Sequence, residues 1–187
     1  MTMRAGQYPL SAQHGRITLR TSRDGLAGKA GHDLTIDVSR WSGELVIGAD
    51  LAPTSLDVQI DLGSLDVRAG TGGLKPLTDR DKGEIVATAR KVLSVDRYPE
   101  ATFAASSFNT AGDGGGTISG TFTIAGQSGP LVLEVRENGP DRFLARATVR
   151  QTSFGIKPYS GFLGALRVSD AVEVEVEVEV DLAAVTR

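Results

Sequence analysis

Hydrophobic and polar residues alternate one by one over most of the chain, which is the pattern of strands with one buried face. In segment 117–124, Ile118, Phe122 and Ile124 share one face, and hydroxyl side chains take the other. The same alternation occurs in segments 16–20, 34–38, 56–62, 131–136 and 142–150. Turn residues at 49–54, 113–116 and 138–141 separate these segments. The pattern therefore predicts an all-β domain.

Segment 172–180 gives the strongest indication of how the sheet is exposed, because valine and glutamate alternate there without interruption. Burying unpaired carboxylates is costly, so the glutamate face is expected to lie in water. A long strand with one wet and one dry face is typical of an antiparallel sheet with solvent outside. We therefore expect a closed antiparallel barrel of about eight strands.

One segment departs from this alternation. Between 78 and 93 the apolar residues recur at helical spacing. Thr78, followed three residues later by Asp81, is typical of the capping box that begins a helix. The sequence thus predicts one amphipathic helix over about 79–93, packed against the barrel or capping one end.

Composition narrows the class of protein. A length of 187 residues suits a single domain over 1–187, and a net charge of −3 with scattered cations does not favour nucleic acid or anionic membranes. The absence of cysteine excludes disulfides and thiolate metal sites. With no apolar run long enough for a spanning helix and no visible signal peptide, we expect a cytoplasmic protein without an integral membrane segment.

Residues for catalysis or metal binding are sparse. His14, His32 and Asp33 could form an acid–base or metal site if they converge, but two histidines are few for a metal centre. The chain lacks the G-x-S-x-G motif of serine hydrolases. We expect no catalytic residues, no metal and no cofactor, and keep a site at His14, His32 and Asp33 as an alternative.

The apolar faces either fill the barrel or line a void. Several inward positions carry small residues (Gly120, Ala145, Ala147 and Ala105), which favours a void. The residues predicted to line this cavity are Ile17, Leu19, Ile36, Val58, Ile60, Phe103, Ile118, Phe122, Leu133, Phe143, Phe154, Val174 and Val176.

Taken in order, several motifs make the chain resemble the YceI-like family. They are Arg80-Asp81 in the helix, 98–103 (YPEATF), 120–126 (GTFTIAG), 153–156 (SFGI) and 168–172 (VSDAV), and the resemblance extends from about His14 to Val180. It implies a lipocalin-like barrel of eight strands with a helix at its side and a long apolar tunnel for polyisoprenoid chains. It implies no catalytic residues. Many members of the family are periplasmic, and some are induced by stress.

The sequence thus favours a non-enzymatic protein that binds, stores or transports a long apolar lipid of the polyisoprenoid type, with a role in stress response. Besides the site at His14, His32 and Asp33, a domain with a filled core that works through its surface is a second alternative. Its glutamate face at 172–180 would then contact a basic partner. A homodimer is left open.

Overall fold

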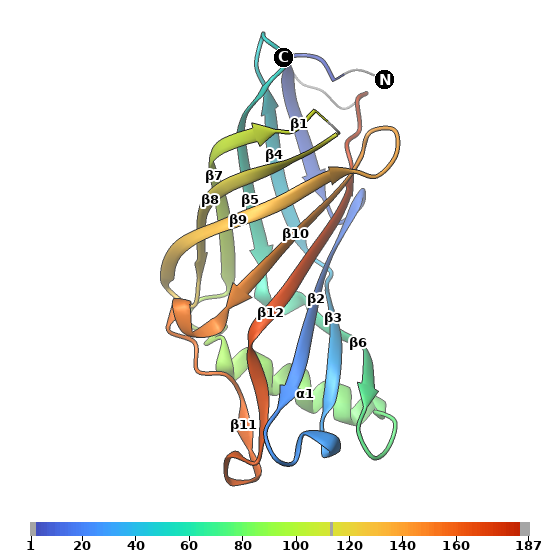
Figure 1. Cartoon of the computed structure of the whole chain (residues 1–187), viewed down its shortest axis with the longest axis vertical. Coiled ribbons are helices and arrows are strands. Elements are labelled where there is room, and N and C mark those ends of the chain that lie inside the picture. The colour runs from blue at the N-terminus through green and yellow to red at the C-terminus, as the bar shows by residue number, and fades with distance from the viewer. Residues whose placement is uncertain (1–2, 113, 184–187) are drawn as a thin grey trace.

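A computed structural model describes residues 3–112 and 114–183, which form one curled antiparallel sheet with a helix across its lower part (Figure 1). The strands are β1 (Gly6–Ser11), β2 (Gly15–Asp24), β3 (His32–Val38), β4 (Trp41–Ile47), β5 (Pro53–Asp61), β6 (Leu65–Gly72), β7 (Glu100–Thr110), β8 (Gly115–Ile124), β9 (Gln127–Glu137), β10 (Arg142–Arg150), β11 (Ser160–Gly161) and β12 (Leu166–Glu179). The α-helix is α1 (Asp79–Val92), and short 3₁₀ turns are η1 (Gly28–Ala30), η2 (Leu62–Ser64), η3 (Gln151–Phe154) and η4 (Phe162–Gly164).

The sheet is a half-barrel. Its strand order is β1-β4-β5-β7-β8-β9-β10-β12-β2-β3-β6, with β11 paired to β12 outside this path. The all-β, antiparallel class and the lipocalin-like curl were therefore predicted correctly. The prediction of a closed barrel of about eight strands was wrong, because the sheet has 12 strands and ends at β1 and β6 without joining them.

Part of the higher strand count has a local cause, which is that long strands bend and change neighbours. Residues 39–40 separate β3, which pairs with β2 and β6, from β4, which pairs with β1 and β5. The turn η2 separates β5 from β6 in the same way. Two long strands are thus counted as four, and consecutive strands β3 and β4 lie near opposite ends of the strand order.

The two bends lie side by side and are held together by hydrogen bonds. The Ser39 amide donates to the Ser64 carbonyl at 3.1 Å, and the Arg40 amide donates to Ser64 Oγ at 3.0 Å. Arg40 Nη2 lies 2.8 Å from Asp61 Oδ2. Burial alone would raise the pKa of Asp61, but hydrogen bonds from Arg40 and the Gly63 amide, with the charges of Arg40 and Arg90, hold it below its ordinary value.

The outer face of β12 carries its glutamates, as the alternation predicted. Glu175 nevertheless has a side chain that is only 15% exposed, because Arg20 and Arg146 of the neighbouring strands cover it. Glu179 pairs with Arg142 at 2.9 Å. Part of this face is therefore an ion-pair surface within the chain, since a paired carboxylate tolerates partial burial.

Helix α1 begins as the sequence predicted. The Asp81 amide donates to Thr78 Oγ1 at 3.2 Å, and the Thr78 amide donates to an Asp81 carboxylate oxygen at 2.8 Å, which completes the capping box. The helix runs beside β6 (Figure 1). Its apolar side chains pack against the core. Within the described residues, no helix has the length and apolar character needed to cross a bilayer.

Candidate ligand-binding cavity

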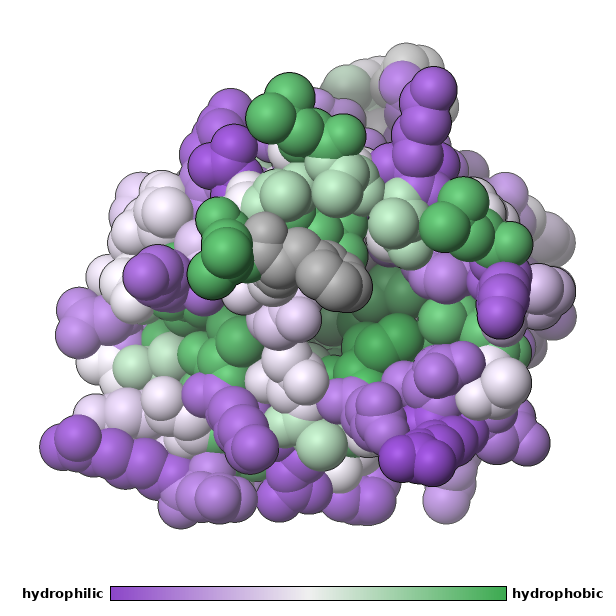
Figure 2. Space-filling model, turned by 90° about the horizontal axis from the view of Figure 1, so that it is seen from below, coloured by the Kyte–Doolittle hydropathy of each residue, from purple (hydrophilic) through white to green (hydrophobic). Residues whose placement is uncertain are grey.

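The half-barrel encloses a cavity of about 1170 Å³. Its wall includes Tyr159 and Arg167 near the start of β12 and Val180 just past its end. The 14 residues of β12 rise by roughly 3.3 Å each when fully extended, so this wall is at most about 45 Å long, and the register shift between Val168 and Val172 shortens it. Seen from below, a hollow with hydrophobic walls opens between polar side chains (Figure 2).

The residues that sequence alternation places on the inner face border this cavity, with one exception. Those on its wall are Ile17, Leu19, Ile36, Val58, Ile60, Phe103, Ile118, Phe122, Leu133, Phe143, Val174 and Val176. They come from β2, β3, β5, β7, β8, β9, β10 and β12, so every side of the curled sheet contributes. Whether they contact a ligand remains a prediction.

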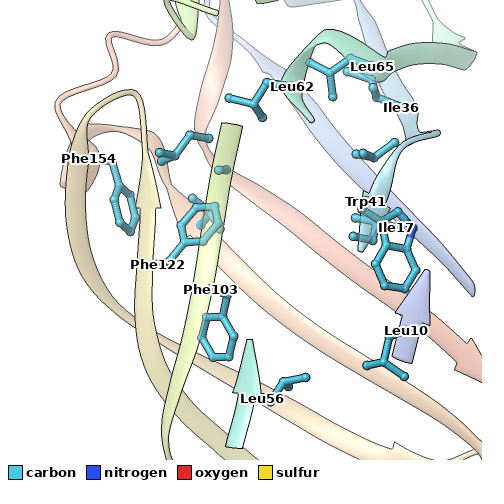
Figure 3. Close-up of a cluster of buried hydrophobic side chains, with 14 of the residues drawn as sticks. Leu10, Ile17, Ile36, Trp41, Leu56, Leu62, Leu65, Phe103, Phe122 and Phe154 are labelled. Carbon is cyan, nitrogen blue, oxygen red and sulfur yellow. The ribbon is translucent and has the colours of Figure 1, made fainter. Parts of the chain in front are cut away.

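Phe154 is the exception, because it is buried outside the cavity wall. Its ring packs edge-on against Phe122, and the ring centroids are 5.4 Å apart. In Figure 3, Phe122 lies between Phe154 and the interior. Gly120 also differs from the expectation that it leaves space, since a Cβ there would come within 2.6 Å of the Phe103 ring.

The residues that border the cavity are buried to different degrees. Side chains such as Ile17 and Trp41 pack in a cluster on one side, while Leu56 and Phe103 project from the facing wall (Figure 3). In contrast, Val174 and Val176 point inward but are only half-buried. Half-burial of apolar residues on an inner face is expected when they border open space instead of other side chains.

Sequence alternation did not identify the polar residues at the lower mouth. Arg23, His32, Lys75 and Arg167 all border the cavity there. Arg23 Nη1 donates to the Gly31 carbonyl at 2.6 Å, whereas no hydrogen bond or ion pair is seen for the Lys75 and Arg167 side chains among the described residues. These residues lie in or beside loops, where hydrophobic periodicity carries no information.

Two polar atoms on the cavity wall are buried without a hydrogen-bond partner among the described residues. They are the Trp41 indole nitrogen, Nε1, and Thr21 Oγ1. Trp41 is 7% exposed, and a buried indole N–H usually has an acceptor. Both atoms are shielded from the cavity space, so the missing partner is a cost within the fold.

The alternative site at His14, His32 and Asp33 does not converge. His14 precedes β2, whereas His32 lies level with Arg23 near the other end of that strand, so the two rings are separated by about ten residues, or roughly 30 Å. His32 Nε2 lies 2.8 Å from the Lys75 carbonyl, and Asp33 accepts a hydrogen bond from the Arg23 amide at 2.8 Å. Among the described residues, no three His, Asp or Glu side chains gather as a metal site would require.

Comparisons with known proteins agree with this architecture. The family model of the YceI-like domain matches residues 8–180. The crystal structure of Burkholderia cenocepacia BcnA has a TM-score of 0.63 at 16% identity and covers 88% of this chain and 94% of its own. The Campylobacter jejuni YCEI protein has a TM-score of 0.59 at 18% identity, with 78% and 84% covered. These identities support the shared fold alone, and no curated protein matches the chain.

Proposed function

The chain belongs to the YceI-like family, and from this premise we propose that it binds a long apolar lipid of the polyisoprenoid type inside the half-barrel without changing it chemically. The observation that carries the proposal is the cavity of about 1170 Å³ with apolar walls on every side. Typical small-molecule pockets have volumes of roughly 300–1,000 Å³, so this one suits a larger ligand.

The energetics fit a tail more than a compact ligand. Each 100 Å² of apolar surface removed from water contributes about 2.5 kcal/mol, so a long chain gains affinity along its whole length. Lys75 and Arg167 border the cavity at the lower mouth, together with Asp81 and Glu84 of α1, whereas Glu137 borders it at the upper end. We place the tail along β12, with a polar headgroup at the lower mouth, where both cations lie.

The buried donor of Trp41 sets no requirement on the ligand, because Nε1 is shielded from the cavity space. The ligand class is therefore defined by the apolar walls alone, which suit a long polyprenyl chain. Storage or transport of such a molecule requires retention without reaction, which agrees with the separation of His14 from His32.

The alternative of a filled core is less well supported. A filled interior predicts no continuous cavity, and the glutamates that would attract a basic partner are partly engaged by Arg20, Arg142 and Arg146 of the same chain. The lipid proposal uses the interior, and the surface alternative leaves it without a role.

The proposal is tested by native mass spectrometry after exposure to polyprenyl lipids, followed by solvent extraction. Ala145 borders the cavity opposite Val176, so Ala145→Trp places a large ring in the path of the tail. We expect the wild type to retain an extractable lipid and this variant to lose it while remaining folded. Thr148→Trp, on the outer face of the same strand, is the matched control and should retain the lipid. No uptake by the wild type would refute the proposal.

A further inference from the structure

Three segments meet at the lower end of the molecule, and we call them the lower tip: residues 25–31, 73–77 and 159–167 (Figure 1). Each carries one leucine exposed to solvent: Leu26 at 102%, Leu74 at 80% and Leu163 at 109%. Other exposed large apolar side chains among the described residues reach 55% at most. A cluster of fully exposed apolar side chains is typical of an interaction surface.

The lower tip also has a charge that the rest of the chain does not share. Each segment carries one cation, namely Lys29, Lys75 and Arg167, and none contains Asp or Glu. At the opposite end, the turns 48–52 and 138–141 contain aspartate and no Lys or Arg. The three tip segments thus carry three cations and no carboxylate, in contrast to the net charge of −3 of the whole chain.

The carboxylate closest in sequence to the lower tip is Asp24, which immediately precedes segment 25–31 and accepts a hydrogen bond from the Gly25 amide at 2.6 Å. Asp81, on the first turn of α1, is held by Thr78. These carboxylates lie on the strand and helix behind the tip segments. Asp79, the first residue of α1, is fully exposed and lies 4.0 Å from Lys82 Nζ, so the carboxylates nearest the tip have partners beside them in the chain.

Contacts join the three segments into one surface. The Ala27 amide donates to the Ala165 carbonyl at 2.8 Å, which links the first segment to the third. His32, which follows the first segment, places Nε2 2.8 Å from the Lys75 carbonyl in the second. Gly73 has a φ of +74°, and its missing Cβ leaves room for the His32 ring. The leucines thus project from a connected base.

We propose that the lower tip docks on the surface of a bilayer that contains anionic lipids. Leu26, Leu74 and Leu163 insert at the boundary between headgroups and acyl chains, and the cations lie among the lipid phosphates. Charge complementarity favours this occupant, because the exposed leucines match the acyl chains, and the cations, for which no ion pair is seen among the described residues, match the anionic headgroups. The hydrophobic hollow opens at the same end (Figure 2). The docking proposal rests on the lower tip alone. Passage of a lipid tail between the bilayer and the cavity rests in addition on the proposed function.

The test is co-sedimentation of the full chain with vesicles of phosphatidylcholine, with and without an equal share of phosphatidylglycerol. We expect binding to the anionic vesicles, weakened by high salt. The double variant Leu26→Ser/Leu163→Ser should bind at least about 10-fold more weakly, because both inserted side chains are lost. Lys29→Glu should weaken binding roughly 10-fold, because it reverses a charge at the membrane surface.

Two controls match these changes away from the tip. Val132→Ser removes an apolar side chain that is 50% exposed on the outer face of β9, and Arg136→Glu reverses an exposed charge on the same strand. Both should bind vesicles as the wild type does. Absence of wild-type binding, or equal losses in the tip variants and controls, would overturn the proposal.

A second measurement separates docking from lipid binding. The altered tip residues Leu26, Leu163 and Lys29 do not border the cavity, so these variants should take up a polyprenyl lipid dispersed in detergent as the wild type does. Vesicle binding without uptake would refute the proposed function and leave docking intact. Uptake without vesicle binding would refute docking and leave the proposed function intact.

Discussion

The ring of Phe154 stands edge-on to the ring of Phe122, with 5.4 Å between centroids and 84° between planes. Phe122 borders the cavity, and Phe154 packs behind it. A Cβ at Gly129 would lie 3.1 Å from the Phe154 ring. The absence of a side chain at Gly129 therefore makes room for this ring. The two aromatic residues therefore have different roles, although the sequence placed both on the inner face.

Replacing Phe154 should affect stability more than binding. Phe154→Leu removes a buried ring and its edge-on contact, which is expected to lower the free energy of unfolding by about 1–2 kcal/mol. Lipid affinity should change less than in Phe103→Leu, which alters the cavity wall itself. Urea unfolding and lipid uptake measured on both variants check this. A folded Phe154→Leu protein that no longer takes up lipid would contradict the assignment.

Trp41→Phe is expected to leave ligand preference unchanged. The variant keeps an aromatic ring and loses an Nε1 donor that is shielded from the cavity, so affinities for polyprenyl ligands with and without an oxygen should change by the same factor. Competition between the two ligands measures the difference. A selective loss for the ligand that carries an oxygen would contradict this expectation.

Glu175 should make stability depend on pH in the acid range. Hydrogen bonds from Arg20 and Arg146 hold the pKa of Glu175 below its ordinary value of 4.5, so the folded state favours the carboxylate. This stabilisation is present above about pH 4.5 and is lost as the pH falls through the lower folded-state value.

Glu175→Gln should therefore cost about 0.5–1 kcal/mol at neutral pH, a modest value because both arginines are largely solvated. The variant's free energy of unfolding should also fall less than that of the wild type as the pH is lowered. Glu173→Gln, on the same face but exposed, is the control and should leave the acid dependence close to that of the wild type. Chemical unfolding over a series of pH values makes the comparison.

Ser64→Ala tests the junction of the two bends. Ser64 is 4% exposed, and its hydroxyl oxygen accepts the Arg40 amide, so the alanine variant leaves a part-buried donor unpaired. We expect a loss of about 1–2 kcal/mol in the free energy of unfolding. Ser42→Ala, at an exposed position on β4, should cost less. Similar losses for both would show that the junction adds no specific stability.

Alternation predicted much of the sheet because one physical rule governs each strand: one face meets water and the other does not. This rule placed Val174 and Val176 on the cavity side and Glu175 outside. The capping box at Thr78 and Asp81 could also be predicted from the sequence, because its hydrogen bonds join residues that are three apart in the chain.

Features that depend on distant partners were not predictable in this way. Residues 39–40 carry no glycine or proline, so nothing local indicates the bend that their hydrogen bonds to Ser64 stabilise. Phe154 lies in η3, after the end of β10. Strand alternation does not apply to a 3₁₀ turn, so it could not predict the direction of this side chain. The charge of the lower tip was missed because a net charge sums over both ends of the molecule.

The unjoined edges of the sheet bear on how widely the molecule can open. In a closed barrel, strand number and shear set the circumference, so widening it means breaking the hydrogen-bonded ring. Here β1 and β6 terminate the strand order, and Pro9 leaves β1 one amide donor fewer for pairing with another chain. A small change of twist, spread over many strands, would alter the width of the cavity without breaking the hydrogen bonds between neighbouring strands. We therefore expect the sheet to be compliant across its width and to accept tails of different girth within one fold.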